Sequence, residues 1–334
     1  MSDVVKAAPS RLMVILAFAV VYIVWGSTYF FIRLAIEDFP PFLMAAIRFV
    51  IAALVMFVWC GLRRETLFNW QDIKPAIVSG LLMLVIGNGA VVWSEQYLAS
   101  SLVAILVSAG PIWFVMLDKR NWGINLRSKS IITGLLIGFI GVIVLFSENV
   151  MDAISGAGSV VQIVATGLLI IGSIAWAGGS LYSKYRTTNS SNAVNTSWQM
   201  LSAGIAFSMI SVFSGETSGF SLAAPSVTGW LAIAYLIVFG SIIGYSSYVW
   251  LLSVRPATQV STHSYVNPIV AVLLGVLFVG EELSLVQISG LAIILFSVLL
   301  INLNKYLKPS TAEVTKTPST DNVKQHSFQT EEVP

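Results

Sequence analysis

The chain has 334 residues, of which 56% are hydrophobic and only 10% are charged. Soluble globular proteins carry about 25% charged residues, so this composition excludes a chain that folds with a water-facing surface all round. The mean hydropathy of +0.84 agrees with that exclusion. The net charge of +2 and the single cysteine, Cys60, give no sign of a nucleic-acid partner, an internal disulfide or a metal site.

Long apolar stretches follow one another almost from end to end of the chain. About 20 helical residues cross the hydrocarbon core of a bilayer, because each residue rises about 1.5 Å through about 30 Å. Connections as short as residues 37–40 make neighbouring helices antiparallel. We therefore expect an all-α polytopic membrane protein. Its ten predicted transmembrane helices cover residues 12–36, 41–61, 73–97, 99–118, 130–147, 160–184, 194–214, 228–252, 257–279 and 285–305.

The positions of lysine and arginine predict how the spans are oriented. With the N-terminus inside, 16 of the 18 basic residues fall on the cytoplasmic side, and the other two, Arg33 and Arg48, lie within spans. The opposite loops hold acidic residues and no basic ones, which is the positive-inside pattern. We therefore expect both termini in the cytoplasm. Residues 1–11 form the N-terminus, and residues 306–334 form a polar tail that should be disordered.

A weak internal repeat divides the chain into two halves of five spans, residues 12–147 and 160–305. The halves are joined by an outer linker at 148–159. Because five is an odd number, the two halves must have inverted topology. Inverted repeats place a substrate site near the bilayer midplane and indicate a carrier that works by alternating access.

Several residue matches carry this repeat. The segment Ile23-Val24-Trp25-Gly26-Ser27 resembles Ile174-Ala175-Trp176-Ala177-Gly178. At the same spacing Arg33 matches Lys184, and Arg48 falls opposite Gln199. Gly110-Pro111 corresponds to Asn267-Pro268 in the second half.

A set of short motifs is shared with one known family. The motifs are Trp25-Gly26-Ser27-Thr28-Tyr29, the segment 40–49, Gly87-Asn88-Gly89 with Glu95, and the segments 172–177, 239–243 and 265–275 followed by Gly280-Glu281. Over about residues 12–305 the chain resembles the EamA family of the drug/metabolite transporter superfamily, and within it the YedA-like exporters. It departs from their pattern at His263, where an aromatic residue is expected, and in its long polar tail.

The resemblance implies a fold and an activity. The fold would be ten helices in two inverted five-helix repeats around a central cavity, in the inner (cytoplasmic) membrane of the cell. The activity would be export of metabolites, amino acids or drugs, with proton exchange as the proposed driving force.

Ionisable side chains inside spans are candidates for function, because each costs about 2.5–3.5 kcal/mol at a helix centre and normally faces a cavity or a partner. Arg48 and Glu95 lie at comparable depths in the outer half and can pair. Such a pair is either a gate that exchanges a proton with substrate or a fixed salt bridge. His263 either binds substrate and relays protons or bonds a neighbouring helix. Arg33 can snorkel to the interface.

Aromatic residues in the middle of spans form a second class of candidates. Trp25 and Trp176 are related by the repeat and lie away from the interface where tryptophan is usually found. Together with Tyr245 and Tyr248 they either line a cavity suited to aromatic or amphipathic solutes or pack between helices.

Two prolines within predicted spans form a third class. Pro111 and Pro268 each leave a carbonyl group unpaired and kink the helix. Freed backbone groups at membrane depth usually line a cavity, although a purely architectural role is the alternative. Asn267 adds a polar amide beside Pro268, and we expect it to bind substrate.

Motifs of catalysis are missing from the sequence. It contains no Walker A sequence, no HExxH and no paired catalytic carboxylates, so we expect neither an enzyme nor a cofactor. The sequence predicts a secondary active transporter that exports small metabolites or drugs by alternating access with proton exchange, as a monomer or a homodimer. A facilitative uniporter or channel-like permease is the alternative.

Overall fold

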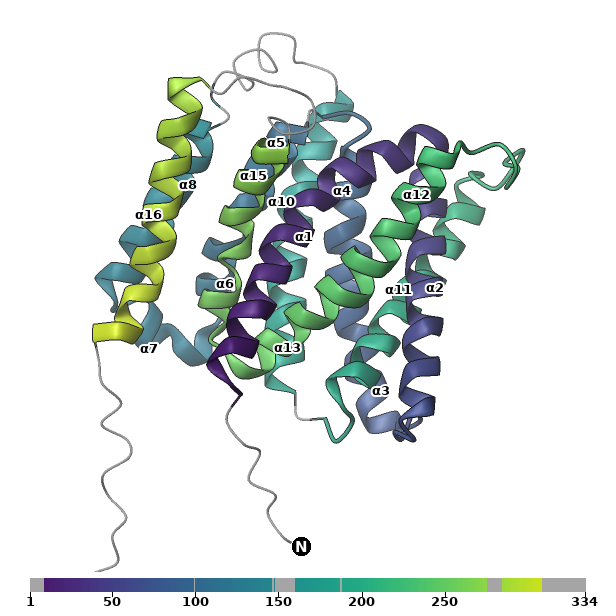
Figure 1. Ribbon diagram of the computed structural model, residues 1–334, viewed down its shortest axis with the longest axis horizontal. Helices are drawn as coiled ribbons and strands as arrows, with labels where there is room; N and C mark the ends of the chain where they lie inside the picture. The colour runs from purple at the N-terminus through teal and green to yellow at the C-terminus, as the bar shows by residue number, and fades with distance from the viewer. Residues whose placement is uncertain are drawn as a thin grey trace, which may run out of the picture.

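The computed structural model is a bundle of long helices (Figure 1) and describes residues 9–98, 100–145, 147, 160–186, 188–274 and 284–307. Within those ranges the regular structure is entirely helical. The expected outer linker, 148–159, and the expected tail beyond residue 307 lie outside the described residues.

The helices of the first half are α1 (Arg11–Asp38), α2 (Pro41–Leu62), α3 (Trp70–Gly80), η1 (Leu81–Asn88), α4 (Gly89–Ser94), α5 (Ser100–Ser108), α6 (Gly110–Leu117), η2 (Lys119–Asn121), α7 (Trp122–Asn125) and α8 (Lys129–Leu145).

The second half follows a similar order of long and interrupted helices. Its helices are α10 (Val160–Tyr185), α11 (Asn192–Phe213), α12 (Val227–Tyr235), η3 (Leu236–Tyr245), α13 (Ser246–Val254), α14 (Ala257–Val260), α15 (His263–Leu274) and α16 (Leu285–Leu307).

Several helices are suited to crossing a membrane by their length and composition. Among the described residues five meet that criterion alone, and a bent pair, Lys119–Asn125 with Lys129–Leu145, makes a sixth if it is one span. Two shorter apolar helices cover Val103–Leu117 and Leu285–Ile301. The chain is therefore a multi-pass membrane protein with five or six candidate spans by this measure, fewer than the ten expected. The five are Arg11–Asp38, Pro41–Leu62, Trp70–Ser94, Val160–Tyr185 and Val227–Val254.

The difference has causes that can be traced to particular residues. Helix α11 occupies the expected seventh span, but polar residues such as Gln199 lower the hydropathy of its first half. The hydrogen-bonding pattern of the expected fourth span breaks at Ala109, so that Pro111 lies in the first turn of α6, and the apolar helix Val103–Leu117 is too short to count as a span by this measure. The expected ninth span begins as α14 and continues as α15, which contains Pro268.

The central helices pack as two groups, each drawn from both halves of the chain. In the first group, α1 packs against α12, η3 and α13 on one side and against α15 on the other. In the second group, α10 packs against α3, η1 and α4 and against α5 and α6. Helices α2 and α11 pack on each other and contact both groups. Helices α8 and α16 form a separate pair at the left edge of Figure 1.

Glycine allows the closest approaches within these groups. A Cβ added to Gly26 of α1 would lie 3.0 Å from the carbonyl oxygen of Asn267 on α15 and closer still to Val270. A Cβ on Gly87 of η1 would lie 3.0 Å from the indole of Trp176 on α10. Small residues at helix crossings let backbones meet in this way in membranes.

Two aspartates tie helix ends together within the groups. Asp38, at the end of α1, accepts hydrogen bonds from the backbone N–H and hydroxyl of Ser226, the N-cap of α12. Asp72, in the first turn of α3, accepts bonds from the backbone N–H groups of Asn189 and Ser190, just after α10. Each group is thus fastened at one end by a buried or half-buried carboxylate.

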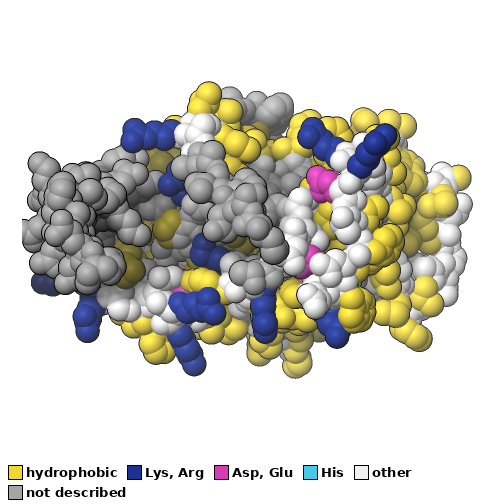
Figure 2. All heavy atoms as spheres, turned by 90° about the horizontal axis from the view of Figure 1, so that it is seen from below, with side chains coloured by type: hydrophobic (Ala, Val, Ile, Leu, Met, Phe, Trp, Pro, Cys, Tyr) yellow, Lys and Arg dark blue, Asp and Glu magenta, His cyan; other side chains and the backbone are white. Residues whose placement is uncertain are grey.

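The two ends of the bundle differ in charge. Figure 2 shows the end where α1 begins, with lysine and arginine side chains spread across it. We call this the basic end. Its basic residues lie at helix termini and connections and include Arg63, Arg64, Lys74, Lys119, Arg120, Lys129, Arg186 and Arg255.

Candidate functional site

A cavity of about 100 Å³ lies between the first and the second group of helices. That volume has room for several water molecules or part of a small solute. The first group contributes lining residues from α1, η3 and α15, the second group from η1, α4, α5, α6 and α10, and α2 adds Arg48 and Phe49. Among the residues that the structure describes, no aspartate or glutamate lines the cavity.

Six residues that the sequence singled out for substrate binding line this cavity, and one lies beside it. The six are Trp25, Arg48, Trp176, Tyr245, His263 and Asn267. Tyr248 is fully buried and makes ring contacts with four of them instead of facing the cavity. Glu95, Pro111 and Pro268 are not among the lining residues, although Gly110, beside Pro111, is.

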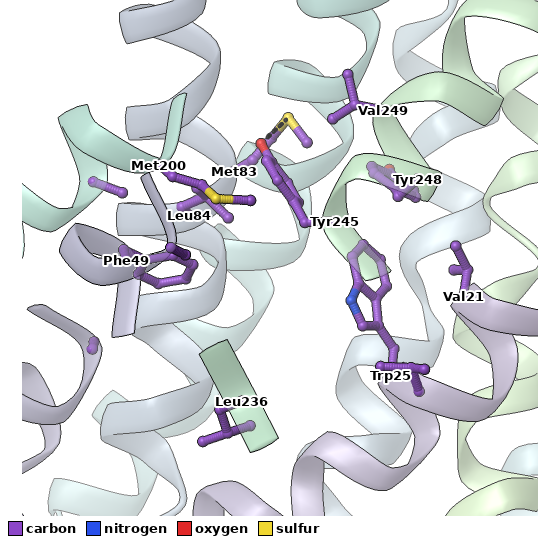
Figure 3. Packing of buried hydrophobic residues seen from close by; sticks show 14 of the residues in the cluster. Val21, Trp25, Phe49, Met83, Leu84, Met200, Leu236, Tyr245, Tyr248 and Val249 are labelled. Carbon is purple, nitrogen blue, oxygen red and sulfur yellow. Dashed lines mark hydrogen bonds between the residues drawn. The ribbon is translucent and has the colours of Figure 1, made fainter. Parts of the chain in front are cut away.

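The aromatic rings meet where the two groups of helices come together. Trp25 and Trp176 make an edge-to-face contact with ring centroids 5.4 Å apart. Tyr248 packs on Trp25 at 4.8 Å, and Figure 3 shows these two rings side by side among the buried apolar residues. The Trp176 indole N–H donates to the Tyr248 hydroxyl at 2.9 Å, and Ser180 bonds the same hydroxyl at 2.7 Å. The repeat-related tryptophans thus form the base of the cavity.

Tyr245 extends the polar network away from the cavity. Its hydroxyl donates to Gln199 Oε1 at 2.8 Å, and it lies 3.7 Å from the sulfur of Met83 (Figure 3). The Gln199 amide in turn donates to Ser79 Oγ at 2.9 Å. Gln199 is the residue that falls opposite Arg48 in the internal repeat, so each half places one polar side chain at this position.

Four polar atoms on lining residues are buried and have no hydrogen-bond partner in the part of the chain that the structure describes. They are Arg48 Nη1, Asn88 Oδ1, His263 Nε2 and Asn267 Oδ1. Buried polar groups in proteins are nearly always hydrogen-bonded, because leaving one unpaired costs about 1–3 kcal/mol. Four such atoms around one cavity mark it as a place where a polar solute or water would be bound.

Arg48 is the fixed positive charge of the cavity. Its Nε donates to Ser241 Oγ at 2.8 Å, and its guanidinium lies 4.8 Å from the Phe49 ring. These contacts position the side chain while leaving Nη1 unpaired. The expected pairing of Arg48 with Glu95 is wrong. The guanidinium donates to Ser241 instead, and neither carboxylate oxygen of Glu95 has a hydrogen-bond partner among the described residues.

Glu95 lies at the end of α4, away from the basic end. Both of its carboxylate oxygens are buried without a hydrogen-bond partner. Arg33 Nη1 donates to the Glu95 backbone oxygen at 3.1 Å, and the guanidinium interacts electrostatically with the carboxylate. Arg33, expected to snorkel to the interface, is therefore also bonded to the second group of helices.

His263 and Asn267 are one turn apart on α15. The His263 ring makes edge-to-face contacts with Trp25 at 5.0 Å and Tyr248 at 5.3 Å. Its Nδ1 lies 3.5 Å from the Asn267 amide nitrogen, which leaves Nε2 and the Asn267 oxygen unpaired. An imidazole with one free nitrogen can donate or accept a proton at that atom.

Sequence reasoning missed some of the polar lining residues. Tyr29, Asn88, Ser173 and Ser264 all line the cavity. The first three lie within the shared motifs quoted above, and membership of a motif was the signal that could have identified them. Nothing in a single sequence distinguishes the face of each helix that turns toward the other group.

The comparisons with known proteins agree on the type of protein. Residues 12–147 and 164–303 match the EamA-like transporter family. The chain is 38% identical over 291 residues to YedA of Escherichia coli (strain K12), which is described as an uncharacterized inner membrane transporter. The aligned region covers 86% of this chain and 90% of YedA. The resemblance expected from the motifs is thereby confirmed.

More distant relatives also match this chain over more than four fifths of its length. The chain is 24% identical to a probable amino-acid metabolite efflux pump of Escherichia coli (strain K12), over 82% of this chain and 90% of that protein. A solved crystal structure superposes with a TM-score of 0.69 at 16% identity and covers 88% of this chain and 97% of that chain. This likeness shows that the fold is shared.

Proposed function

Because the chain belongs to the EamA-like transporter family, we propose that it is a secondary active transporter that exports small metabolites by alternating access. The observation that carries the proposal is the cavity between the two helix groups, where four buried polar atoms have no partner in the middle of an apolar bundle. A polar solute bound in the cavity would supply the missing hydrogen-bond partners.

Ten spans in two inverted repeats are part of this proposal. The packing of α1 against α12–η3–α13 and α15 has a counterpart in the packing of α10 against α3–η1–α4 and α5–α6. The third helix of each half also contains a π-helical segment, η1 or η3, at its centre. Such matched pairs favour a pseudo-two-fold relation. They also favour a movement in which the first group of helices rocks against the second group. The moving bodies would then be the two groups and not the two halves of the chain.

We orient the protein with its basic end in the cytoplasm. Lysine and arginine gather at that end, and the opposite end carries Glu37, Asp38 and Glu216. The positive-inside rule then places both ends of the chain in the cytoplasm. The relative YedA is described as an inner membrane transporter, which supports the same membrane for this chain.

The lining favours a cargo with a carboxylate and an apolar or aromatic body. Arg48 supplies an unpaired guanidinium nitrogen, and guanidinium is the group best suited to bind a carboxylate. Trp25 and Trp176 supply ring surfaces, and Asn88 and Asn267 supply amide oxygens that can accept from an amine. Amino acids with large side chains combine these features, in line with the relative described as an amino-acid metabolite efflux pump.

Proton exchange through Glu95 and His263 completes the proposed mechanism. Each has a buried atom that can take up a proton and has no hydrogen-bond partner. Movement of protons inward, down their gradient, would then drive the solute outward.

The experiment uses purified protein in liposomes and radiolabelled phenylalanine as probe, with phenethylamine, which lacks the carboxylate, as the matched comparison. We expect saturable phenylalanine flux that is accelerated by an imposed pH gradient, and weak phenethylamine flux. Glu95→Gln combined with His263→Ala should abolish the response to the gradient. Full gradient-driven flux in that variant would contradict proton coupling through these residues, and flux indifferent to the gradient in the unaltered protein would identify a facilitative uniporter.

A further inference from the structure

The hydrogen bonds between the first and second groups are concentrated on the basic side of the cavity. There, Trp176 and Ser180 of α10 share the Tyr248 hydroxyl of α13. One turn beyond Ser180, Lys184 Nζ donates to the backbone oxygens of Leu252 and Arg255 at 2.6 and 2.7 Å. This side of the cavity is closed by a continuous stack of contacts.

Beyond the cavity, toward the other end, the groups are held more weakly. Arg33 Nη1 donates there to the Glu95 backbone oxygen at 3.1 Å, and at the level of the cavity Ser108 Oγ of α5 donates to the Ser264 backbone oxygen of α15 at 2.9 Å. Tyr29, one turn before Arg33, lines the cavity and so does Val91, one turn before Glu95. The cavity therefore extends from the paired tryptophans toward this end, where α5 of the second group packs against α15 of the first group beside it.

Arg33 and Lys184 hold equivalent places in the two halves. Each lies in the last two turns of the first helix of its half, and each donates to a backbone oxygen at the C-terminal end of the third helix of that half. The last carbonyl groups of a helix have no partner within the helix and lie at the negative end of its dipole. A cation is the side chain that such an end binds best. Both contacts also cross from one group to the other.

We propose that Lys184 and Arg33 are the latches of two gates, one at the cytoplasmic end and one at the outer end, and that the stronger connection between the two groups alternates between them. The proposal rests on alternating access in the proposed function. In the conformation seen here the Lys184 latch is closed by two bonds, and the cavity extends toward the outer end. Release of Lys184 lets the groups part on the cytoplasmic side so that a solute can enter. Arg33, which here holds the end of α4 by a single hydrogen bond to the Glu95 backbone oxygen, then binds more strongly as the groups close on the outer side, because the Glu95 carboxylate offers it a second acceptor.

The latches can be tested without knowing the cargo. Cys60 is the single cysteine, so Cys60→Ser gives a cysteine-free background. Ser173 lines the cavity and makes none of the hydrogen bonds described above, so Ser173→Cys provides a probe site. Its reaction rate with a membrane-impermeant maleimide is measured in right-side-out and inside-out vesicles. Lys184→Met keeps the length of the side chain and removes its donors; Arg186→Met, two residues on, is the matched control.

We expect Lys184→Met to raise the labelling rate from the cytoplasmic side about ten-fold relative to the outer side, because two charged hydrogen bonds no longer favour the closed gate. Arg33→Met should shift the ratio the other way, and Lys184→Arg should restore it. Tyr248→Phe, which weakens the same gate independently, should act in the same direction as Lys184→Met. An unchanged ratio in Lys184→Met, or equal shifts in both latch variants, would overturn the proposal even if the unaltered protein transports phenylalanine normally.

Discussion

The indole rings of Trp25 and Trp176 meet edge to face with their centroids 5.4 Å apart, although 151 positions separate them in the chain. One belongs to the first group of helices and the other to the second. The contact lies at the base of the cavity, where the hydrogen bonds on the basic side begin. Any movement of one group against the other must change this contact, so these rings should respond both to bound solute and to the state of the gates.

Truncation of one of these rings should weaken solute binding. An aromatic pair contributes about 0.5–1.5 kcal/mol beyond its buried area, which corresponds to a factor of roughly 2–12. We therefore expect Trp176→Ala to raise the KM for phenylalanine flux several-fold, while Trp176→Phe stays close to the original value. Trp59→Ala, at an exposed position on α2, serves as the control. Equal effects of Trp176→Ala and Trp59→Ala would argue against ring contact with the solute.

Loss of the cavity's fixed charge should discriminate between solutes. A hydrogen bond to a charged group contributes about 1.5–3 kcal/mol, so Arg48→Gln should raise the KM for phenylalanine about 10- to 150-fold. The weak flux of phenethylamine should be unchanged, because it has no carboxylate for Arg48 to bind. Ser241→Ala removes only the group that positions Nε and should have an effect of a few-fold. Equal loss of both fluxes in Arg48→Gln would show that Arg48 has a structural role only.

Close packing of α1 on α15 should make Gly26 intolerant of a methyl group. A Cβ there would collide with Val270 and the Asn267 backbone, and overpacking of this kind costs about 1–3 kcal/mol. Gly178 lies in the second half of the corresponding helix α10, where an added Cβ would meet Leu117 at 4.0 Å and no nearer atom of the described residues. We expect Gly26→Ala to lower the unfolding temperature in detergent by several degrees and Gly178→Ala to leave it unchanged or slightly raised. The opposite order would show that the crossing of α1 and α15 is looser than described.

The buried amide of Gln199 should contribute to stability without contributing to binding. It joins Ser79 to Tyr245, so Gln199→Leu removes one donor to the Ser79 hydroxyl and the oxygen acceptor of the Tyr245 hydroxyl. Hydrogen bonds between membrane helices contribute about 0.6 kcal/mol on average and up to about 1.7. The unfolding temperature should fall by a few degrees with little change in KM. Ser202→Ala, which removes a bond within one helix, is the control; a larger loss in that variant would contradict the assignment.

The proposed orientation can be checked on intact cells. In the Cys60→Ser background, Thr217→Cys lies in the exposed connection after α11 and Arg64→Cys in the exposed connection after α2, at the basic end. An impermeant maleimide should label position 217 in intact cells and position 64 only after the membrane is opened. The reverse result would invert the protein in the membrane and exchange the roles of the two gates.

Much of this protein is determined by sequence alone. Composition and the length of the apolar stretches require a helical membrane protein, because a chain with few charged residues has only lipid to surround it. The alternation of basic and acid-bearing connections predicts its orientation, and the shared motifs identify its family. Six of the seven residues singled out for substrate binding line one cavity, because polar and aromatic groups in the middle of a span need a cavity or a partner.

The tertiary structure decided which of these residues meet. Arg48 binds Ser241 of η3 and not Glu95, because the second helix packs against the third helix of the other half at that depth. Lys184 and Arg33 both bond helix ends across the boundary between the groups, a role that their positions in the sequence do not reveal. The rotation of each helix about its axis, which sets these partners, depends on contacts between segments far apart in the chain, such as the close approach at Gly26. Local sequence carries no information about those contacts, so only the assembled bundle could show them.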